Sequence, residues 1–370
     1  MRKLTFVLSI FVVLTVYVER LQGYQVMLPP NITVPAIFAF GDSIVDTGNN
    51  NHLATIIKCN FPPYGRDFQG GLPTGRFCNG KTPADFIAQS LGIKDLLPAY
   101  LDPYLKPADL LTGVCFASGA AGYDPLTAKV VNVLGLSVQM NMFKEYIGRL
   151  KAMVGEERSA SILSNSLYIV VAGSDDIANT YLGTPFRKFK YDIPAYTDLM
   201  VRGASSFIQE LHDLGARRIG VFSAPPLGCL PSQRTLRGGK QRKCVDGPNQ
   251  VALLFNSKLS AALARFNRKY SEARAVYIDT YTSILQIINN PQSYGFEEVS
   301  KGCCGTGKIE VVILCNKLSP GGTCPDPSKY VFWDSYHPTE KTYKILVDEL
   351  LKKYVFEFFE ANTTIAMYNN

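Results

Sequence analysis

The 370-residue sequence has few of several residues and segments that would point to common functions. It contains three histidines and one tryptophan, so a mechanism that needs an imidazole has only three candidates. After the first 23 residues, no uncharged apolar run reaches the roughly 20 residues that a membrane-spanning helix needs. Lysine and arginine form no stripe and alternate with no aromatic platform, which argues against nucleic-acid binding although the net charge is +7. The mild positive charge is compatible with contact with an anionic lipid surface.

The first 23 residues have the pattern of a secretory signal peptide. Arg2 and Lys3 precede an apolar run of about 15 residues, from 4 to 18, which is too short to span a bilayer. We therefore predict a secreted, extracellular protein in which residues 24–370 form one domain, because no repeat, low-complexity tract or Pro/Ser linker divides them. Two glycosylation sequons, at Asn31 and Asn362, lie near the ends of this predicted mature chain.

All nine cysteines follow this segment, as in an exported protein with disulfides. Because nine is odd, one cysteine is unpaired if the others pair. Cys115 is the predicted free thiol, because it lies in the small-residue stretch GVCFASGAAGY, whereas the others lie in Gly/Pro-rich loops. An alternative is a zinc site built from Cys303, Cys304, Cys315 and Cys324. The adjacent Cys-Cys pair fits disulfides better than the usual spacing of zinc ligands.

Short apolar runs alternate with longer segments of helical spacing. The predicted strands are 36–40, 167–172, 218–222 and 275–278, and the predicted helices are 83–91, 138–154, 196–214, 250–270 and 339–359. This alternation predicts an α/β protein in which helices cover both faces of a parallel sheet. Functional side chains of such folds gather beyond the carboxyl ends of the strands. Ser43 directly follows the first predicted strand and is therefore expected at that rim.

Ser43 needs a base to act as a nucleophile, and His337 is the best of the three histidines. In VFWDSYHPTEKTY, Asp334 lies three residues before His337, so its carboxylate could orient the imidazole while the other ring nitrogen deprotonates the serine. Alternatively, Asp334 caps the last helix and His337 has no catalytic role. His212 lies within a predicted helix, and the loop of His52 has no carboxylate at a short fixed spacing. Structural roles are therefore favoured for both.

Two loops are candidates for an oxyanion hole, the set of donors that stabilises negative charge on a carbonyl oxygen during acyl transfer. FASGAAG contains Gly119, whose backbone N–H can approach a substrate closely because glycine has no side chain. VVAGSDDIANTY leaves the second predicted strand and presents Asp175. Taken alone, each loop is more typical of an ordinary tight turn.

Taken together and in order, four motifs resemble the plant GDSL esterase/lipase family of the SGNH hydrolase superfamily. They are FGDSIVDTGNN, GVCFASGAAGY, VVAGSDDIANTY and FWDSYHPTE. The resemblance extends from about Pro35 to Tyr354 and includes PPYGRDF, PTGRFCNGKTPADFIA, LGARRIGVFSAPPLGCLP and GCCGTG. GSDDIANTY and GYDPLT further resemble the extracellular-lipase branch of anther and pollen coats.

The resemblance implies a three-layer α/β/α sandwich with a flavodoxin-like sheet and a secreted esterase or lipase, located in the cell wall or pollen coat. By position, it makes Ser43 the nucleophile, His337 the base and Asp334 its orienting partner. It places the backbone N–H groups of Ser43 and Gly119 in the oxyanion hole. The implied substrate is a small-molecule or lipid carboxylic ester, with no cofactor and no metal. The α/β-hydrolase elbow G-x-S-x-G is absent, which disfavours that alternative fold.

One position departs from the family pattern, because Asp175 occupies the place of the asparagine that supplies the third oxyanion donor. An ionised carboxylate would repel an oxyanion. Three explanations remain open: Asp175 is protonated because of burial and neighbouring carboxylates, two backbone donors suffice, or the protein binds lipid or acyl-sugar esters without hydrolysing them. The branch resemblance favours a working enzyme. An acyltransferase that uses the same serine is a further alternative, and the sequence leaves the oligomeric state open.

Overall fold

A parallel sheet of four strands lies at the centre of the protein. The computed structural model describes residues 26, 28 and 32–359, and the strand order is β1-β2-β3-β4. The strands match the four predicted runs to within one residue at each end: β1 (Ile37–Gly41), β2 (Leu167–Val171), β3 (Arg218–Phe222) and β4 (Arg274–Ile278). The predicted signal peptide (1–23) and the sequons at Asn31 and Asn362 lie outside the described residues.

Alternate side chains of each strand face opposite sides of the sheet, as the two-residue period of a strand requires. Phe38 and Phe40 of β1 belong to one apolar core, whereas Ile37 and Ala39 belong to the other. All five residues of β1 and of β2 are buried. Strands covered on both faces read as continuous apolar runs, which is why the sequence predicts them so closely.

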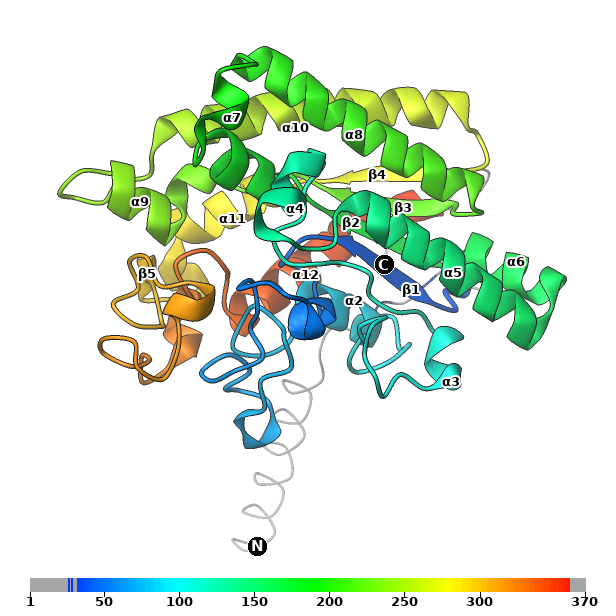
Figure 1. Ribbon diagram of the computed structural model, residues 1–370, viewed down its shortest axis with the longest axis horizontal. Coiled ribbons are helices and arrows are strands. Elements are labelled where there is room, and N and C mark those ends of the chain that lie inside the picture. The colour runs from blue at the N-terminus through cyan, green and yellow to red at the C-terminus, as the bar shows by residue number, and fades with distance from the viewer. Residues whose placement is uncertain (1–25, 27, 29–31, 360–370) are drawn as a thin grey trace, which may run out of the picture.

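Helices cover both faces, so the predicted three-layer α/β/α sandwich is confirmed (Figure 1). All five predicted helices form: α2 (Pro83–Ser90), α5 (Leu136–Val154), α8 (Ile193–Asp213), α10 (Asp246–Lys269) and α12 (Glu340–Tyr354). In Figure 1, α5, α8 and α10 lie above the sheet, and α2 and α12 lie below it. The last predicted helix is shorter than expected, because the chain tightens into the 3₁₀ helix η8 (Val355–Phe358).

Shorter helices occupy the connections, and the sequence pattern did not predict them. They are α3 (Pro107–Leu110), α4 (Pro125–Val131), α6 (Glu156–Asn165), α7 (Pro185–Lys188), α9 (Pro231–Arg237) and α11 (Thr280–Asn289). Four of them, α3, α4, α7 and α9, begin with a proline, which suits the first helical turn. Those with four to seven residues, α3, α4, α7 and α9, contain too few apolar repeats for a period to emerge. Within residues 26, 28 and 32–359, no helix is long and apolar enough to cross a membrane.

The segment 112–118 extends the sheet at the edge of β1, although it was not predicted as a strand. Four backbone hydrogen bonds of 2.7 to 3.4 Å join this segment to β1. In its sequence, TGVCFAS, the glycine, alanine and serine interrupt the strand-forming Val and Phe, so no apolar run of strand length emerges. The pairing brings Gly119 to the carboxyl end of β1, the end at which Ser43 lies.

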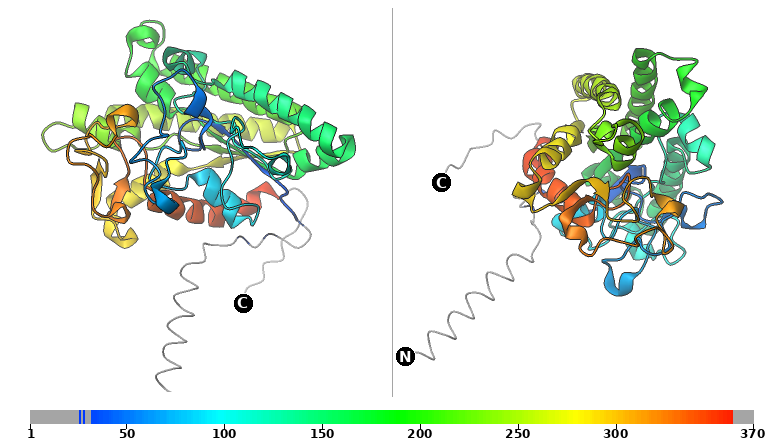
Figure 2. Two further views of the ribbon diagram at one scale, coloured as in Figure 1. Left: turned by 60° about the horizontal axis from the view of Figure 1, so that its bottom comes forward. Right: turned by 90° about the vertical axis from the view of Figure 1, so that its left-hand side faces the viewer.

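A second parallel sheet pairs β5 (Glu298–Gly302) with β6 (Tyr330–Phe332). The segment between these two strands forms a loop that two disulfides close. Figures 1 and 2 place this region at one end of the molecule, opposite the end that carries α6.

Six of the nine cysteines form disulfides: Cys229–Cys244, Cys303–Cys324 and Cys304–Cys315. Cys115 is free and buried, as predicted. Cys59 and Cys78 are also free and buried, so the other eight cysteines do not all pair. The thiol of Cys78 instead donates to the Gly80 carbonyl at 2.9 Å. The alternative zinc site is wrong, because its four cysteines form two of the disulfides.

Candidate active site

Ser43 lies where the chain leaves β1 at the rim of the sheet. Gly41, the last residue of β1, has a φ of 126°, and a Cβ atom there would lie 1.8 Å from the Val171 carbonyl oxygen. Only glycine fits this position, and it lets the chain turn out of the sheet. The Gln139 side chain accepts from the Gly41 N–H and donates to the Gly41 carbonyl, both at 2.9 Å. The turn that presents Ser43 is therefore fixed from α5.

Ser43, His337 and Asp334 form one continuous chain of hydrogen bonds. His337 Nε2 lies 2.8 Å from Ser43 Oγ, and His337 Nδ1 lies 2.8 Å from Asp334 Oδ2. An ionised carboxylate only accepts, so Nδ1 carries a hydrogen and Nε2 of the neutral ring is free to accept from the serine hydroxyl. The structure thus brings together three residues that span 294 positions of the sequence, from 43 to 337. Their arrangement has the geometry of a nucleophile, base and orienting acid.

Gly119 lies at the same rim, but its backbone N–H already has a partner. It donates to Asp46 Oδ2 at 2.9 Å. A Cβ atom at Gly119 would lie 2.3 Å from the Phe77 ring, and this ring packs 5.3 Å, centroid to centroid, from that of His337. The absence of a side chain at Gly119 therefore leaves room for an aromatic ring against His337. Donation by Gly119 to an oxyanion requires the bond to Asp46 to be shared or exchanged.

Asp175 follows β2 and is 3% exposed. Its Oδ1 accepts from the Asn179 side chain, whereas its Oδ2 has no hydrogen-bond partner among the described residues. Burial is the main cause that raises the pKa of Asp175 to about 7; the neighbouring Asp176 raises this pKa further and His337 lowers it. Near neutral pH, a large share of the Asp175 side chains is therefore protonated and can donate a hydrogen bond.

Asp42 lies beside Asp175 and shares its environment. It is 1% exposed, and its Oδ2 also lacks a partner in the described part of the chain. Burial and the Asp175 carboxyl raise the pKa of Asp42 well above its usual value. The neighbouring Asp176 differs, because it accepts from the N–H groups of Tyr123 (2.7 Å) and Asp124 (3.0 Å). Asp176 therefore holds the loop, and Asp42 and Asp175 form a pair of under-bonded buried carboxyls.

The chain also shows clear similarity to known proteins. A sequence model of the GDSL-like lipase/acylhydrolase family matches residues 37–350. The chain belongs to this family. GDSL esterase/lipase EXL3 of Arabidopsis thaliana is 56% identical over 333 residues, covering 90% of this chain and 91% of the relative. GDSL esterase/lipase EXL2 of the same plant is 52% identical over 341 residues, covering 88% and 90% of the two chains.

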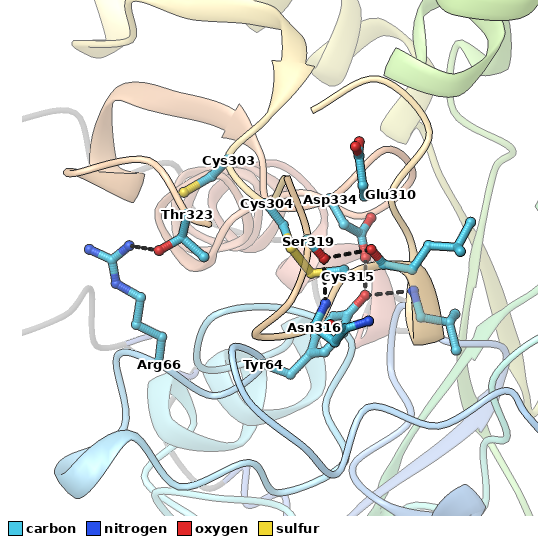
Figure 3. Close-up of a disulfide and its surroundings, with 12 residues drawn as sticks. Tyr64, Arg66, Cys303, Cys304, Glu310, Cys315, Asn316, Ser319, Thr323 and Asp334 are labelled. Carbon is cyan, nitrogen blue, oxygen red and sulfur yellow. Dashed lines mark hydrogen bonds between the residues drawn. A yellow bond between two sulfur atoms is a disulfide. The ribbon is translucent and has the colours of Figure 1, made fainter. Parts of the chain in front are cut away.

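In this GDSL protein, Tyr64 is a site residue that the sequence reasoning missed. Its hydroxyl donates to Asp334 Oδ2 at 2.8 Å, and the same hydroxyl accepts from the Val312 N–H at 2.8 Å (Figure 3). The other oxygen of Asp334 accepts from the backbone N–H groups of Tyr336 (2.8 Å) and His337 (2.6 Å). The signal for Tyr64 was its motif PPYGRDF, but nothing in that motif points to a partner 270 positions away.

The disulfide-closed loop of this GDSL protein supports the Asp334 turn. The Cys304 N–H donates to the Trp333 carbonyl at 2.8 Å, and the Ser335 N–H donates to the Glu310 carbonyl at 2.8 Å. Figure 3 shows the Cys304–Cys315 disulfide, Glu310 and Tyr64 gathered around Asp334. The turn that carries Asp334 is therefore held by a covalently constrained segment.

Proposed function

We propose that the protein is a secreted serine esterase or lipase that hydrolyses carboxylic esters through an acyl-enzyme. Ser43 Oγ attacks the ester carbonyl while His337 Nε2 takes its proton, and Asp334 stabilises the imidazolium that forms. The imidazolium then protonates the leaving alcohol. In the second step, His337 activates a water that hydrolyses the acyl-enzyme and restores Ser43. The observation that supports this proposal most strongly is the pair of 2.8 Å contacts from His337 to Ser43 and to Asp334.

The proposed oxyanion hole uses the backbone N–H groups of Ser43 and Gly119 and the protonated side chain of Asp175. A neutral carboxylic acid can donate a hydrogen bond in place of the family asparagine. The raised pKa of Asp175, about 7, and its unpartnered Oδ2 support this role. As pH rises above about 7, the side chain ionises and the donor is lost.

The proposed substrate is a small-molecule or lipid ester, and the proposed location is extracellular. The three disulfides are typical of proteins from oxidising compartments. The N-terminal pattern that predicts secretion gives the same location, with the cell wall or pollen coat as specific sites. The family relatives are named esterases or lipases, which favours hydrolysis over binding alone.

Labelling by a fluorophosphonate tests the proposal. We expect covalent labelling of the full chain at Ser43 and hydrolysis of nitrophenyl esters, with both lost in Ser43→Ala. Labelling without turnover would instead indicate a protein that binds esters. If an added alcohol diverts most of the acyl group into a new ester, the protein is an acyltransferase.

A further inference from the structure

An apolar cavity lies beside the proposed catalytic centre, between the carboxyl ends of the strands and α12. The cavity is lined by residues that are adjacent in sequence to the proposed nucleophile and base. Ile44 follows Ser43, and Tyr336 and Pro338 flank His337. The cavity is therefore adjacent to the two loops that carry Ser43 and His337.

The interior of the cavity is apolar, with walls from several elements: Phe222 at the end of β3, Leu227 and Leu230 from the following turn, Ile284 of α11 and Leu346 of α12. In the described chain, no charged side chain lines it. The hydroxyl residues of its wall are partly satisfied within the protein, since Thr280 Oγ1 donates to the Ser223 carbonyl at 2.7 Å. Such a lining suits a hydrocarbon chain and offers little to a sugar or a phosphate.

The cavity has a volume of about 60 Å³. A second apolar gap of about 30 Å³ lies farther along α12 and shares Phe222, Val347 and Leu350 with the first. At roughly 10 to 15 Å³ for each water-sized group, the first space holds about four to six groups of that size.

We propose that this cavity binds the acyl chain of the substrate, and that the preferred esters carry unbranched acyl chains of about four to eight carbons. The inference rests on the proposed serine esterase function and names its substrate class. The acyl group, not the alcohol, is the proposed occupant because of the order of the two steps. The alcohol must leave before water enters for the second step, whereas the acyl chain stays bonded to Ser43 through both steps.

The test is a series of nitrophenyl esters from acetate to dodecanoate. Each buried methylene should raise kcat/KM by about fourfold until the space is filled, with a maximum between butanoate and octanoate and a fall at longer chains. Leu346→Phe should move the maximum to shorter acyl chains, and Leu346→Ala should move it to longer ones. A general loss of stability would not move the preferred acyl length in opposite directions in the two Leu346 variants.

Leu263 offers a matched control. It is buried in α10 and lines a separate gap between α8 and α10. Leu263→Phe and Leu263→Ala make the same changes in size and should leave the chain-length profile as in the unmodified protein. Because overpacking a core costs stability, the unfolding temperature of all four variants is measured alongside.

Two results would overturn the inference while leaving the esterase function standing. One is hydrolysis with an acyl-length profile that is unchanged in both Leu346 variants. The other is a shift seen only in a second series, acetates of alcohols from ethanol to octanol, which would assign the cavity to the alcohol. Failure of the proposed function looks different: no ester is hydrolysed and the fluorophosphonate does not label Ser43.

Discussion

The two sides of the candidate active site contain buried carboxyls with contrasting surroundings. Asp334 accepts four hydrogen bonds, from the Tyr64 hydroxyl, the His337 ring and two backbone N–H groups. Asp42 and Asp175 are almost equally buried, yet each has one oxygen without a partner in the described residues. The acid side is thus saturated with donors, and the oxyanion side is not.

This difference shows that burial alone does not decide the charge of a carboxyl. Burial raises the pKa of any carboxylic acid, and donors that bond the anion oppose that effect. Asp334 accepts from four donors, and one of them is the His337 ring that a triad acid must orient. Asp175 accepts from the Asn179 side chain but has fewer donors than Asp334, and burial raises its pKa to about 7. The same fold therefore surrounds one buried carboxyl beside Ser43 with donors and leaves another with few donors and a raised pKa.

The largest expected effect comes from breaking the acid side. In Asp334→Asn, the amide no longer holds the imidazole in the tautomer that can accept from Ser43. We expect kcat to fall about 10,000-fold, measured with a nitrophenyl butanoate at pH 7. An unfolding curve like that of the unmodified protein would confirm that the fold is intact. A loss of less than tenfold would contradict the role of Asp334.

The next effect comes from the oxyanion side. Asp175→Ala removes the proposed donor and should lower kcat by about 100- to 1,000-fold. Asp175→Asn supplies a permanent donor and should keep or raise the activity at pH 7. It should also abolish the decline in kcat that we expect for the unmodified protein above pH 7. A steep loss in Asp175→Asn would show that the carboxyl itself is required.

The same substitution affects stability with a defined sign. The pKa of Asp175 is raised from 3.8 to about 7 in the folded state, so the folded protein holds a proton that the unfolded chain releases above about pH 4. Its contribution to stability is therefore complete below about pH 4 and is lost as pH rises through about 7. The unfolding temperature of Asp175→Asn relative to the unmodified protein should rise between pH 4 and pH 8. A constant difference across that range would contradict the raised pKa.

Tyr64→Phe tests one of the four donors to Asp334. Loss of a hydrogen bond to a charged group should reduce the free energy of unfolding by about 1.5 to 3 kcal/mol. We expect a fall in kcat of about tenfold, since the other three donors remain. Tyr123→Phe is the matched control, because the Tyr123 hydroxyl is buried without a partner in the described chain. Equal effects of the two substitutions would argue against a specific role for Tyr64.

The smallest expected change in kcat comes from opening the loop behind Asp334. Replacing Cys304 and Cys315 with serine should cost about 3 kcal/mol of stability and lower kcat on an acetyl ester severalfold. Replacing Cys229 and Cys244 in the same way removes a loop constraint of similar length, with separations of 15 and 11 residues. Its stability loss should be similar, but its kcat on acetate should not change. Equal losses of kcat would indicate that the Cys304–Cys315 loop has no special link to Asp334.

Much of the fold could be predicted because its signals are local. The four strands are buried on both faces, so each appears as an apolar run between polar segments. The helices α5, α8, α10 and α12 repeat their apolar positions over several turns. The short helices α3 and α7 have four residues each, too few for a period. The edge segment 112–118 was missed because small residues interrupt its apolar residues, so that no apolar run appears. Its backbone nevertheless pairs with β1.

The candidate site likewise has some features that are local in the sequence and others that depend on contacts between distant segments. The spacing of Asp334 and His337, three positions apart, is a local pattern that places both on one turn. The position of Ser43 at the rim of the sheet is predicted because Ser43 directly follows the first strand. Tyr64 could not be linked to Asp334 from sequence, because the contact depends on how two distant loops fold together. The pairing of Cys303 with Cys324 and of Cys304 with Cys315 was open for the same reason.

By itself, the sequence determined the order of strands and helices, the family, and the residue types available for acyl transfer, because these depend on short-range period and spacing. Only the tertiary structure decided which groups meet. It set the number of donors around each buried carboxyl, the partners of the cysteines and the space beside α12. Distances between remote segments and the exclusion of water control these properties, and neither can be obtained from a local pattern of residues.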